Sequence, residues 1–339
     1  MVELKKWIVA LTLFCSIGLI GCLQQSATQK HDSTETPKAE RTEQQEASKQ
    51  TESTKQPVAQ TEIIPAPVPV INIIDPISNK LIHTLTPIDL GYEMDIAAYI
   101  AKVEQLAREL ARGTDGKAGY DQRMVLDKLD EHGNLIKGNP LIILRESVLV
   151  ERIMEASADG GTVELPLEIT ESGYDPEDIP HLDEVVIASY TTYFNPAKTN
   201  RNKNIELSAV AIDKIIVGKD DQFSFNTVVG PRDEANGYQP APEIINKKLV
   251  MGIGGGVCQT SSTLFNAVDQ FPVKYIEWHH HSIDIGYVPK GRDATVSYGG
   301  LDFRFRNTAG APFLIKAIYG NGFLTIEIRT AKKYVDAFK

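Results

Sequence analysis

The chain has 339 residues and a formal net charge of −10 at pH 7, with 42% hydrophobic and 24% charged residues. This length suggests about two domains, and the hydrophobic fraction is sufficient for a globular core. The acidic balance argues against a nucleic-acid-binding protein, which needs a basic surface to displace counterions from phosphates. Three cysteines are too few for a disulfide scaffold.

Residues 1–21 have the pattern of an export signal peptide. Two lysines precede an apolar run from Trp7 to Ile20, which is shorter than the ~20 residues that a membrane-spanning helix needs. The run ends in Leu19-Ile20-Gly21-Cys22, which resembles the bacterial lipobox and implies lipidation of Cys22. The alternative is an ordinary signal peptide with a chance cysteine. With Cys15 in the signal and Cys22 blocked, we expect Cys258 to be the remaining free thiol.

Residues 22–70 are predicted to be a disordered tether. From Gln24 to Gln60 the chain contains no Leu, Ile or aromatic residue, so it cannot offset the entropy lost on ordering. Prolines then stiffen the last part. We expect a protein anchored in the membrane through lipidated Cys22, lying on the extracytoplasmic face and reaching into the cell wall or periplasm.

Residues 71–187 are predicted to form a small α+β domain. A helix is expected from Asp95 to Arg112, because apolar residues recur there with helical spacing and Gly113 follows. A second helix is expected from Glu146 to Ala158. The alternation of Val163, Leu165 and Leu167 then predicts a half-buried strand.

Residues 188–332 are predicted to form a second α+β domain with antiparallel strands. Asn204 is expected to cap a helix that extends to Ile216. Four strands are expected after Cys258, at 273–278, 301–305, 312–319 and 323–329. Gly320-Asn321-Gly322 predicts a hairpin turn between the last two.

The most specific segment runs from Met251 to Phe265 and reads MGIGGGVCQTSSTLF. Helical spacing after the glycines places Cys258 in the first turn of a helix. The free N–H groups and the positive dipole end favour a thiolate there and could stabilise an oxyanion. A buried, inert cysteine is the structural alternative. No lysine follows the glycines as a phosphate-binding loop would require.

A cysteine nucleophile needs a base, and Trp278-His279-His280-His281-Ser282 supplies the candidates. If this segment continues a strand, His279 and His281 share one face and His280 takes the other. Asp293 is the best candidate to orient the base, with Asp302 and Glu277 as alternatives. The His-x-His pair could instead bind zinc with Cys258 or Asp293, or form an exposed histidine-rich turn.

The second region resembles the VanW family over residues ~188–330. Several motifs occur in order, and the sequence supplies each of them: Tyr190-Thr191-Thr192, Arg201-x-x-Asn204-Ile205, Gln222-Phe223-Ser224-Phe225-Asn226, Val229-Gly230-Pro231-Arg232, Gly237-Tyr238, Gly254 to Leu264, His281-Ser282, Tyr287-Val288-Pro289-x-Gly291-x-Asp293-Ala294-Thr295-Val296 and Asp302-x-Arg304-Phe305-x-Asn307. The preceding region resembles a domain that often lies before VanW domains, which implies peptidoglycan binding.

The resemblance implies a cell-envelope protein that acts on peptidoglycan, with a link to glycopeptide resistance. Some members are linked to L,D-transpeptidation through the glycine-flanked cysteine, here Cys258, with His281 or His279 and Asp293 assigned as partners by chemistry. Oxyanion or substrate contacts are expected at Gly255, Gly256, Val257, Gln259, Ser261, Arg232 and Tyr238. The expected partners are peptidoglycan stem peptides and the membrane, with no nucleic acid, metal or cofactor. A non-catalytic peptidoglycan-binding protein and a zinc-dependent hydrolase are the alternatives.

Overall fold

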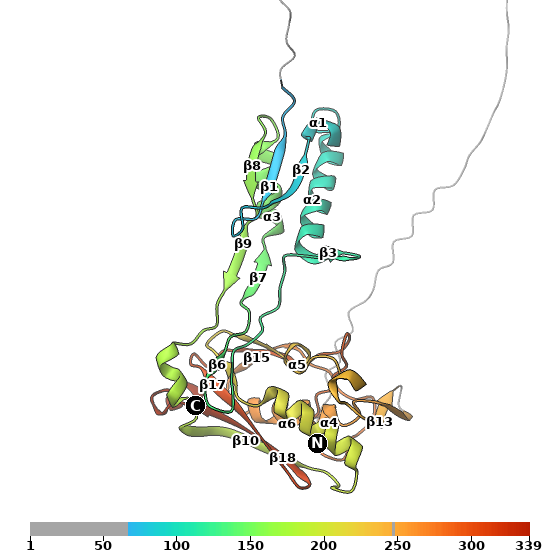
Figure 1. The fold of residues 1–339 in the computed structure, drawn as a ribbon, viewed down its shortest axis with the longest axis vertical. Coiled ribbons are helices and arrows are strands. Elements are labelled where there is room, and N and C mark those ends of the chain that lie inside the picture. The colour runs from blue at the N-terminus through green and yellow to red at the C-terminus, as the bar shows by residue number, and fades with distance from the viewer. Residues whose placement is uncertain (1–66, 246–247) are drawn as a thin grey trace, which may run out of the picture. The chain divides into compact units, whose positions relative to one another are not determined.

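The computed structural model describes residues 67–245 and 248–339 (Figure 1). The predicted signal peptide, the lipobox with Cys22 and nearly all of the predicted tether lie outside the described residues. The predicted α+β class is confirmed, because helices and mostly antiparallel sheets alternate along the chain. No helix in the described ranges is long and apolar enough to cross a bilayer.

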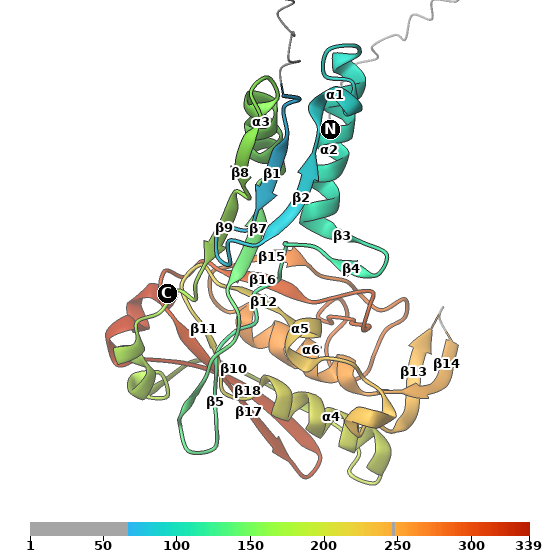
Figure 2. The ribbon, with the colours of Figure 1, turned by 45° about the horizontal axis from the view of Figure 1, so that its top comes forward.

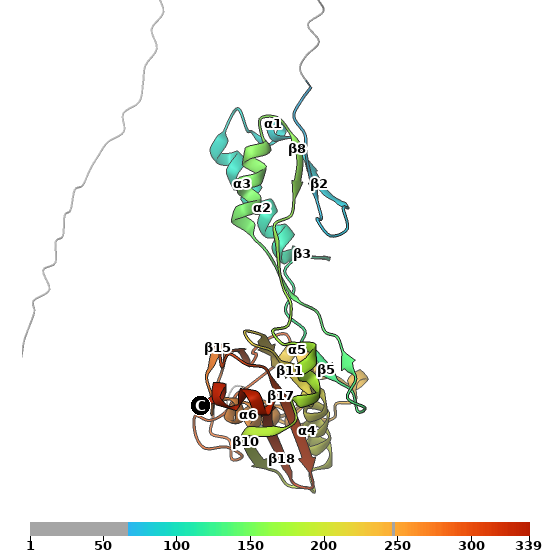
Figure 3. The ribbon, with the colours of Figure 1, turned by 90° about the vertical axis from the view of Figure 1, so that its left-hand side faces the viewer.

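A three-stranded sheet and two helices form the first core. Strand β1 (Ile71–Ile74) pairs antiparallel with β2 (Leu81–Leu85) and parallel with β8 (Gly161–Glu164). Helices α2 (Ile96–Arg112) and α3 (Glu146–Ala156) pack against each other beside this sheet (Figure 3). The core between them is apolar and includes Tyr99, Val103, Leu149 and Ile153.

The two helices follow the sequence prediction closely. Asp95 caps α2 by accepting a hydrogen bond from the Ala98 N–H at 3.0 Å. Gly113 ends the helix with a φ of 84°, a backbone conformation that favours glycine. Helix α3 ends two residues before the predicted Ala158.

The predicted strand through Val163, Leu165 and Leu167 is two strands. Strand β8 ends at Glu164, and β9 (Leu167–Thr170) pairs with β7 (Leu141–Leu144) in a separate sheet. Pro166 lies between them and has no N–H with which to continue a ladder. The alternation of apolar residues therefore continues from β8 into β9, although the two strands belong to different sheets.

Part of the first region is built into the second. Strands β5 (Lys128–Leu129) and β6 (Leu135–Ile136) extend a six-stranded sheet. The order of this sheet is β10 (Val185–Tyr193), β18 (Phe323–Thr330), β17 (Phe313–Gly320), β11 (Ile215–Val217), β5, β6. Met124 and Leu126 lie in the core of that sheet. The predicted boundary between residues 187 and 188 falls inside β10 (Val185–Tyr193), which pairs with β18 (Phe323–Thr330) on both sides of it.

Two helices cover one face of the six-stranded sheet (Figure 2). Helix α6 (Val257–Val268) contacts β10 and β18, and α4 (Thr199–Ile212) contacts α6 and β17 (Phe313–Gly320). A second sheet has the order β12 (Gln222–Ser224), β16 (Arg304–Asn307), β15 (Val273–Glu277). Tyr275 on β15 and Phe303, directly before β16, pack on Phe265 of α6. Helix α6 is thus buried along nearly its whole length.

The C-terminal hairpin is confirmed, since β17 and β18 pair up to Gly320 and Phe323. The strand predicted at 301–305 begins later, as β16 (Arg304–Asn307). A hairpin of β13 (Pro240–Ile245) and β14 (Lys248–Ile253) was not anticipated. The remaining elements are α1 (Pro87–Leu90), β3 (Gly113–Thr114), β4 (Lys117–Ala118), η1 (Pro176–His181), β11 (Ile215–Val217), β12 (Gln222–Ser224), α5 (Phe225–Val229), η2 (Glu234–Asn236), β15 (Val273–Glu277) and η3 (Lys332–Phe338).

The prediction that Asn204 caps a helix is wrong. Helix α4 begins at Thr199 and ends at Ile212, and Ile216 lies in strand β11. Asn204 is fully buried inside α4. Its Nδ2 donates to the carbonyls of Gln239 and Gly255, both at 2.9 Å, so its polar side chain fixes the glycine loop.

Candidate active site

The glycine loop is shaped by close backbone approach. Gly254 and Gly256 have φ values of 94° and 112°, which favour glycine. A Cβ on Gly256 would lie 2.8 Å from Cγ of Arg201, and one on Gly254 would lie 3.0 Å from Cβ of Arg232. A Cβ on Gly255 would approach two carbonyl oxygens at 2.5 and 2.6 Å. The loop is therefore held between the stems of two arginines.

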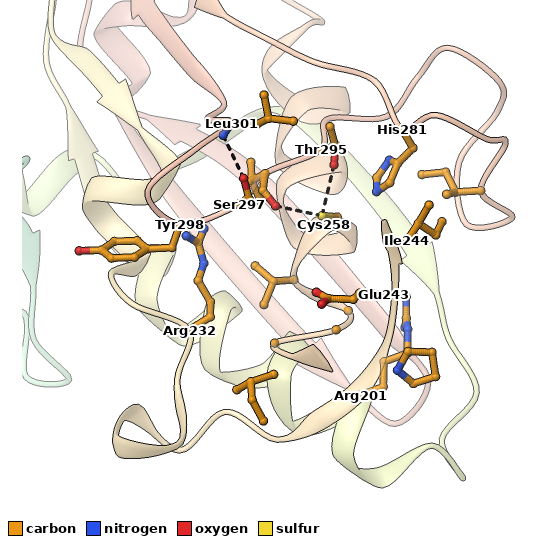
Figure 4. Close-up of a pocket in the computed structure, with 18 of the residues that line it drawn as sticks. Arg201, Arg232, Glu243, Ile244, Cys258, His281, Thr295, Ser297, Tyr298 and Leu301 are labelled. Carbon is orange, nitrogen blue, oxygen red and sulfur yellow. Dashed lines mark hydrogen bonds between the residues drawn. The ribbon is translucent and has the colours of Figure 1, made fainter. Parts of the chain in front are cut away.

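This loop places Cys258 in the first turn of α6, as predicted. The thiol is half-buried. Its Sγ lies 3.7 Å from the Thr295 Oγ1 and 3.5 Å from the Val296 carbonyl oxygen (Figure 4). The nucleophile predicted from the sequence thus faces the segment that carries Asp293.

His281 and Asp293 complete a line of three side chains with Cys258. The His281 Nδ1 lies 2.7 Å from the Asp293 Oδ2, and the same oxygen accepts the His281 backbone N–H at 2.6 Å. Both side chains are only 7% exposed. With Nδ1 engaged by the carboxylate, the His281 Nε2 remains for Cys258. Trp278 secures the same segment by donating its indole N–H to the Asp293 carbonyl at 2.8 Å.

The electrostatics of the three residues are coupled. Burial raises the pKa of the Cys258 thiol, but the interaction with His281, together with the contacts to Val296 and Thr295, outweighs burial, so the pKa lies below its ordinary value. Burial lowers the pKa of His281, yet Cys258 and Asp293 together raise it above its usual value. Burial raises the pKa of Asp293, but hydrogen bonds from His281 and His280 bring it below normal. These directions are those of a thiolate–imidazolium pair held by a carboxylate.

The expected pairing of His279 with His281 is wrong. Strand β15 ends at Glu277 with a register shift, so strand alternation does not reach the histidines. His279 contacts the Glu277 carboxylate at 3.1 Å, whereas His280 shares Asp293 with His281 at 2.9 Å. Glu277, one of the two alternative acids, therefore contacts His279 rather than His281.

Asp302, the other alternative acid, lies in a separate buried network. It accepts hydrogen bonds from Ser224 and from the Asn226 N–H. Asp293 is therefore the carboxylate that orients His281. Among the described residues no group of three or more His, Cys, Asp or Glu side chains is arranged to hold a metal.

Three residues that were expected to contact the oxyanion or the substrate do not line the pocket. The Gln259 side chain donates to Thr192 and Tyr193. Ser261 donates to the Ala294 carbonyl at 2.6 Å and braces the Asp293 segment from behind. Tyr238 is 3% exposed in the apolar core. On helix α6, successive residues point in different directions, so sequence proximity to Cys258 does not bring the side chains of Gln259 and Ser261 into the site.

Fewer backbone N–H groups than expected are available to stabilise an oxyanion. The Val257 and Gln259 N–H groups donate to the carbonyls of Gly254 and Gly256, at 3.2 and 2.9 Å. Within the described ranges the Cys258 N–H has no such partner. It is the donor best placed to meet an oxyanion formed on an attacked carbonyl.

Cys258 opens into a pocket of about 770 Å³. The expected residues Gly255, Gly256, Val257 and Arg232 line it, together with His281. Other lining residues were not predicted as part of the site, among them Arg201, Glu243, Tyr287, Thr295 and Tyr298. Arg201, Tyr287 and Thr295 belong to the motifs that carry the family resemblance, so these motifs could have identified them as site residues.

Comparison with known proteins agrees with the motifs. A family model described as VanW like protein matches residues 200–329. "Uncharacterized protein YoaR" of Bacillus subtilis (strain 168) is 40% identical over 202 residues, which cover 59% of this chain and 67% of that protein.

"Vancomycin B-type resistance protein VanW" of Enterococcus faecalis (strain ATCC 700802 / V583) is 30% identical over 121 residues, 34% of this chain and 44% of that relative. No solved structure shows significant similarity to the chain. The family match covers the glycine loop, Cys258, His281 and Asp293, and the chain belongs to the VanW family.

Proposed function

We propose that the protein is a cysteine acyltransferase of the cell envelope, an L,D-transpeptidase that forms 3–3 cross-links between peptidoglycan stem peptides. The observation that carries this proposal is the line Cys258–His281–Asp293 at a helix start that opens into a pocket. A nucleophile, a base and a group that orients the base are the parts that acyl transfer requires.

In the first step the Cys258 thiolate attacks the carbonyl carbon of the third residue of a donor tetrapeptide. The Cys258 N–H stabilises the oxyanion. As the tetrahedral intermediate collapses, the C–N bond breaks and His281 transfers its proton to the leaving amine of D-Ala. The product is a thioester on Cys258.

In the second step an amine from a neighbouring stem attacks the thioester carbonyl. His281 accepts the proton from this amine, the C–S bond breaks and the thiolate is regenerated. The new amide bond is the 3–3 cross-link. Water as the acceptor would release a shortened peptide instead.

We also propose that the reaction takes place at the outer face of the membrane. A lipid on Cys22 and a tether over residues 22–70 would hold the catalytic region on the outer face of the membrane and within reach of the wall polymer. The first α+β region would bind or position peptidoglycan. Support comes from the lysines and apolar run of residues 1–21 and from the resistance protein among the relatives.

The decisive experiment is incubation of the purified protein with disaccharide tetrapeptides, followed by mass spectrometry of the muropeptides. We expect 3–3 dimers, release of D-Ala and a thioacyl adduct on Cys258, and none of these with Cys258→Ala. His279→Ala is the matched control, because His279 contacts Glu277 rather than the thiol. Dimers formed equally well by Cys258→Ala would refute the mechanism, and binding without turnover would favour a non-catalytic wall-binding protein.

A further inference from the structure

Two arginines on the pocket wall lack an acidic partner. Arg201 comes from the first turn of α4, and Arg232 from the segment after α5. In the described part of the chain, neither guanidinium makes a hydrogen bond or an ion pair. The two terminal nitrogens of Arg232 are buried without any hydrogen-bond partner.

The contacts that these arginines do make are with aromatic rings. Arg201 lies over the Tyr287 ring at 5.8 Å, and Arg232 lies between Phe225 at 5.5 Å and Tyr298 at 5.8 Å. A ring face offsets only part of the cost of removing a guanidinium from water. Burial accordingly lowers the pKa of both arginines. Such a pair favours an anionic ligand, to which Arg201 can donate directly. The terminal nitrogens of Arg232 are inaccessible, so Arg232 would act on the ligand through its charge.

One carboxylate shares the pocket. Glu243 on β13 lines the same wall, and burial raises its pKa. It forms no ion pair with either arginine among the residues described. Among the side chains that line the pocket, Arg201, Arg232 and His281 are cationic, and Glu243 and the Cys258 thiolate are anionic. The lining therefore carries one excess positive charge, and Asp293 lies behind His281 outside the lining.

The positions of these charges are set by the nucleophile's own loop. The stem of Arg201 packs on Gly256 and that of Arg232 on Gly254, two and four residues before Cys258. Both arginines line the same pocket as Cys258. An anion bound by them would therefore lie next to the carbonyl group that Cys258 attacks.

We propose, building on the acyl-transfer function, that Arg201 binds the free C-terminal carboxylate of the peptide substrate and that Arg232 strengthens the positive potential from behind Tyr298. The carboxylate belongs to the residue that leaves. Thiolate attack then forms the C–S bond one residue from the C-terminus, and the amino acid departs with its carboxylate intact and its amine protonated by His281. A free carboxylate at this position selects peptides that end one residue after the scissile bond, and rejects amidated or longer ones.

The test separates binding from chemistry. Binding of a stem tetrapeptide ending in D-Ala is compared with binding of its C-terminal carboxamide, by calorimetry on the full-length Cys258→Ala protein. We expect the free acid to bind at least ~10-fold more tightly, since a charge-assisted, bidentate contact is lost in the amide. Arg201→Gln should remove this preference, and Arg201→Lys should retain part of it. Arg306→Gln is the control, because Arg306 pairs with Asp220 at 3.1 Å and does not line the pocket.

The outcomes distinguish this inference from the proposed function. Equal binding of acid and amide, or a preference that survives Arg201→Gln, overturns the inference even when the Cys258 protein forms a thioester with both peptides. A preference that depends on Arg201 in a protein that forms no thioester supports the inference and refutes the transferase. A final binding measurement uses inorganic phosphate as a competitor of the peptide. Displacement of the peptide by millimolar phosphate would assign the arginines to a phosphate ligand and overturn the carboxylate assignment.

Discussion

The thiol of Cys258 owes its acidity to a neighbour rather than to the helix alone. Burial by itself would favour the neutral thiol. The interaction with His281, with smaller contributions from Val296 and Thr295, reverses this and lowers the pKa of Cys258. His281 is in turn held by Asp293 through both its ring and its backbone N–H. The three residues therefore titrate as a unit.

This coupling predicts a pH effect of His281→Ala. Without the histidine, burial remains as the main influence, so the pKa of Cys258 should rise above its ordinary value. Alkylation by iodoacetamide near pH 7 should slow by about 10-fold or more, because each unit of pKa removes about tenfold of the thiolate. Measuring the alkylation rate against pH should show the titration step of the variant at higher pH than that of the parent protein.

The wild-type acylation rate should follow a bell-shaped pH profile. The thiolate is present above the lowered pKa of Cys258, and the imidazolium is present below the raised pKa of His281. The rate should rise through the first value and fall through the second. His279→Ala should leave both limbs unchanged. A thiol titration that is the same in His281→Ala and the parent would contradict the assignment of His281.

At the level of elements, the start of α6 depends on glycine. Gly256 has a φ of 112°, and a Cβ added to it would lie 2.8 Å from a side-chain atom and 3.0 Å from a backbone atom of Arg201. An alanine at this position would have an unfavourable left-handed backbone conformation. Its Cβ would also collide with Arg201, the residue proposed to bind substrate. The loop, the helix start and Arg201 therefore form one packed unit.

We expect Gly256→Ala to destabilise the protein by more than the ~1–2 kcal/mol that a left-handed backbone costs an L-residue, and to slow labelling of Cys258. Gly310→Ala is the matched control, because Gly310 has a φ of 84° but open space around its Cβ position. Chemical denaturation measures both losses. Equal losses in the two variants would show that contact with Arg201 does not matter.

Local sequence patterns predicted those elements that local contacts stabilise. The apolar stripe of α2, its end at Gly113 and the helix start at Cys258 were predicted from neighbouring residues. Asn204 was misassigned because its partners, Gln239 and Gly255, are distant in sequence. The histidines were misassigned because the end of β15 at Glu277 is set by its pairing with β16.

At the scale of the molecule, the two predicted regions share a core. Lys128 on β5 donates to the carbonyls of Val210 and Ala211 at the end of α4, at 2.8 and 3.1 Å. Arg123 contacts the buried Asp302 at 3.4 Å. The segment containing β5 and β6 therefore satisfies polar groups of the VanW region as well as extending its sheet.

We expect a chain of residues 188–339 to be unstable. It lacks Met124 and Leu126 from the core, leaves one edge of β11 unpaired and removes the start of β10. Loss of large buried side chains costs several kcal/mol, and an open strand edge promotes aggregation. A chain of residues 67–339 should be monomeric on gel filtration and unfold cooperatively by circular dichroism. The same behaviour from residues 188–339 would show that the shared core is dispensable.

The pairing of Lys128 with Ile215 also imposes an order on folding. Strand β5 is synthesised well before its neighbour β11, and β17 and β18, which lie between β11 and β10 in the sheet, are synthesised near the end of the chain. Closing a long loop before any pairing contact forms slows the search for the native state. The six-stranded sheet should therefore be completed late, after the whole chain is available.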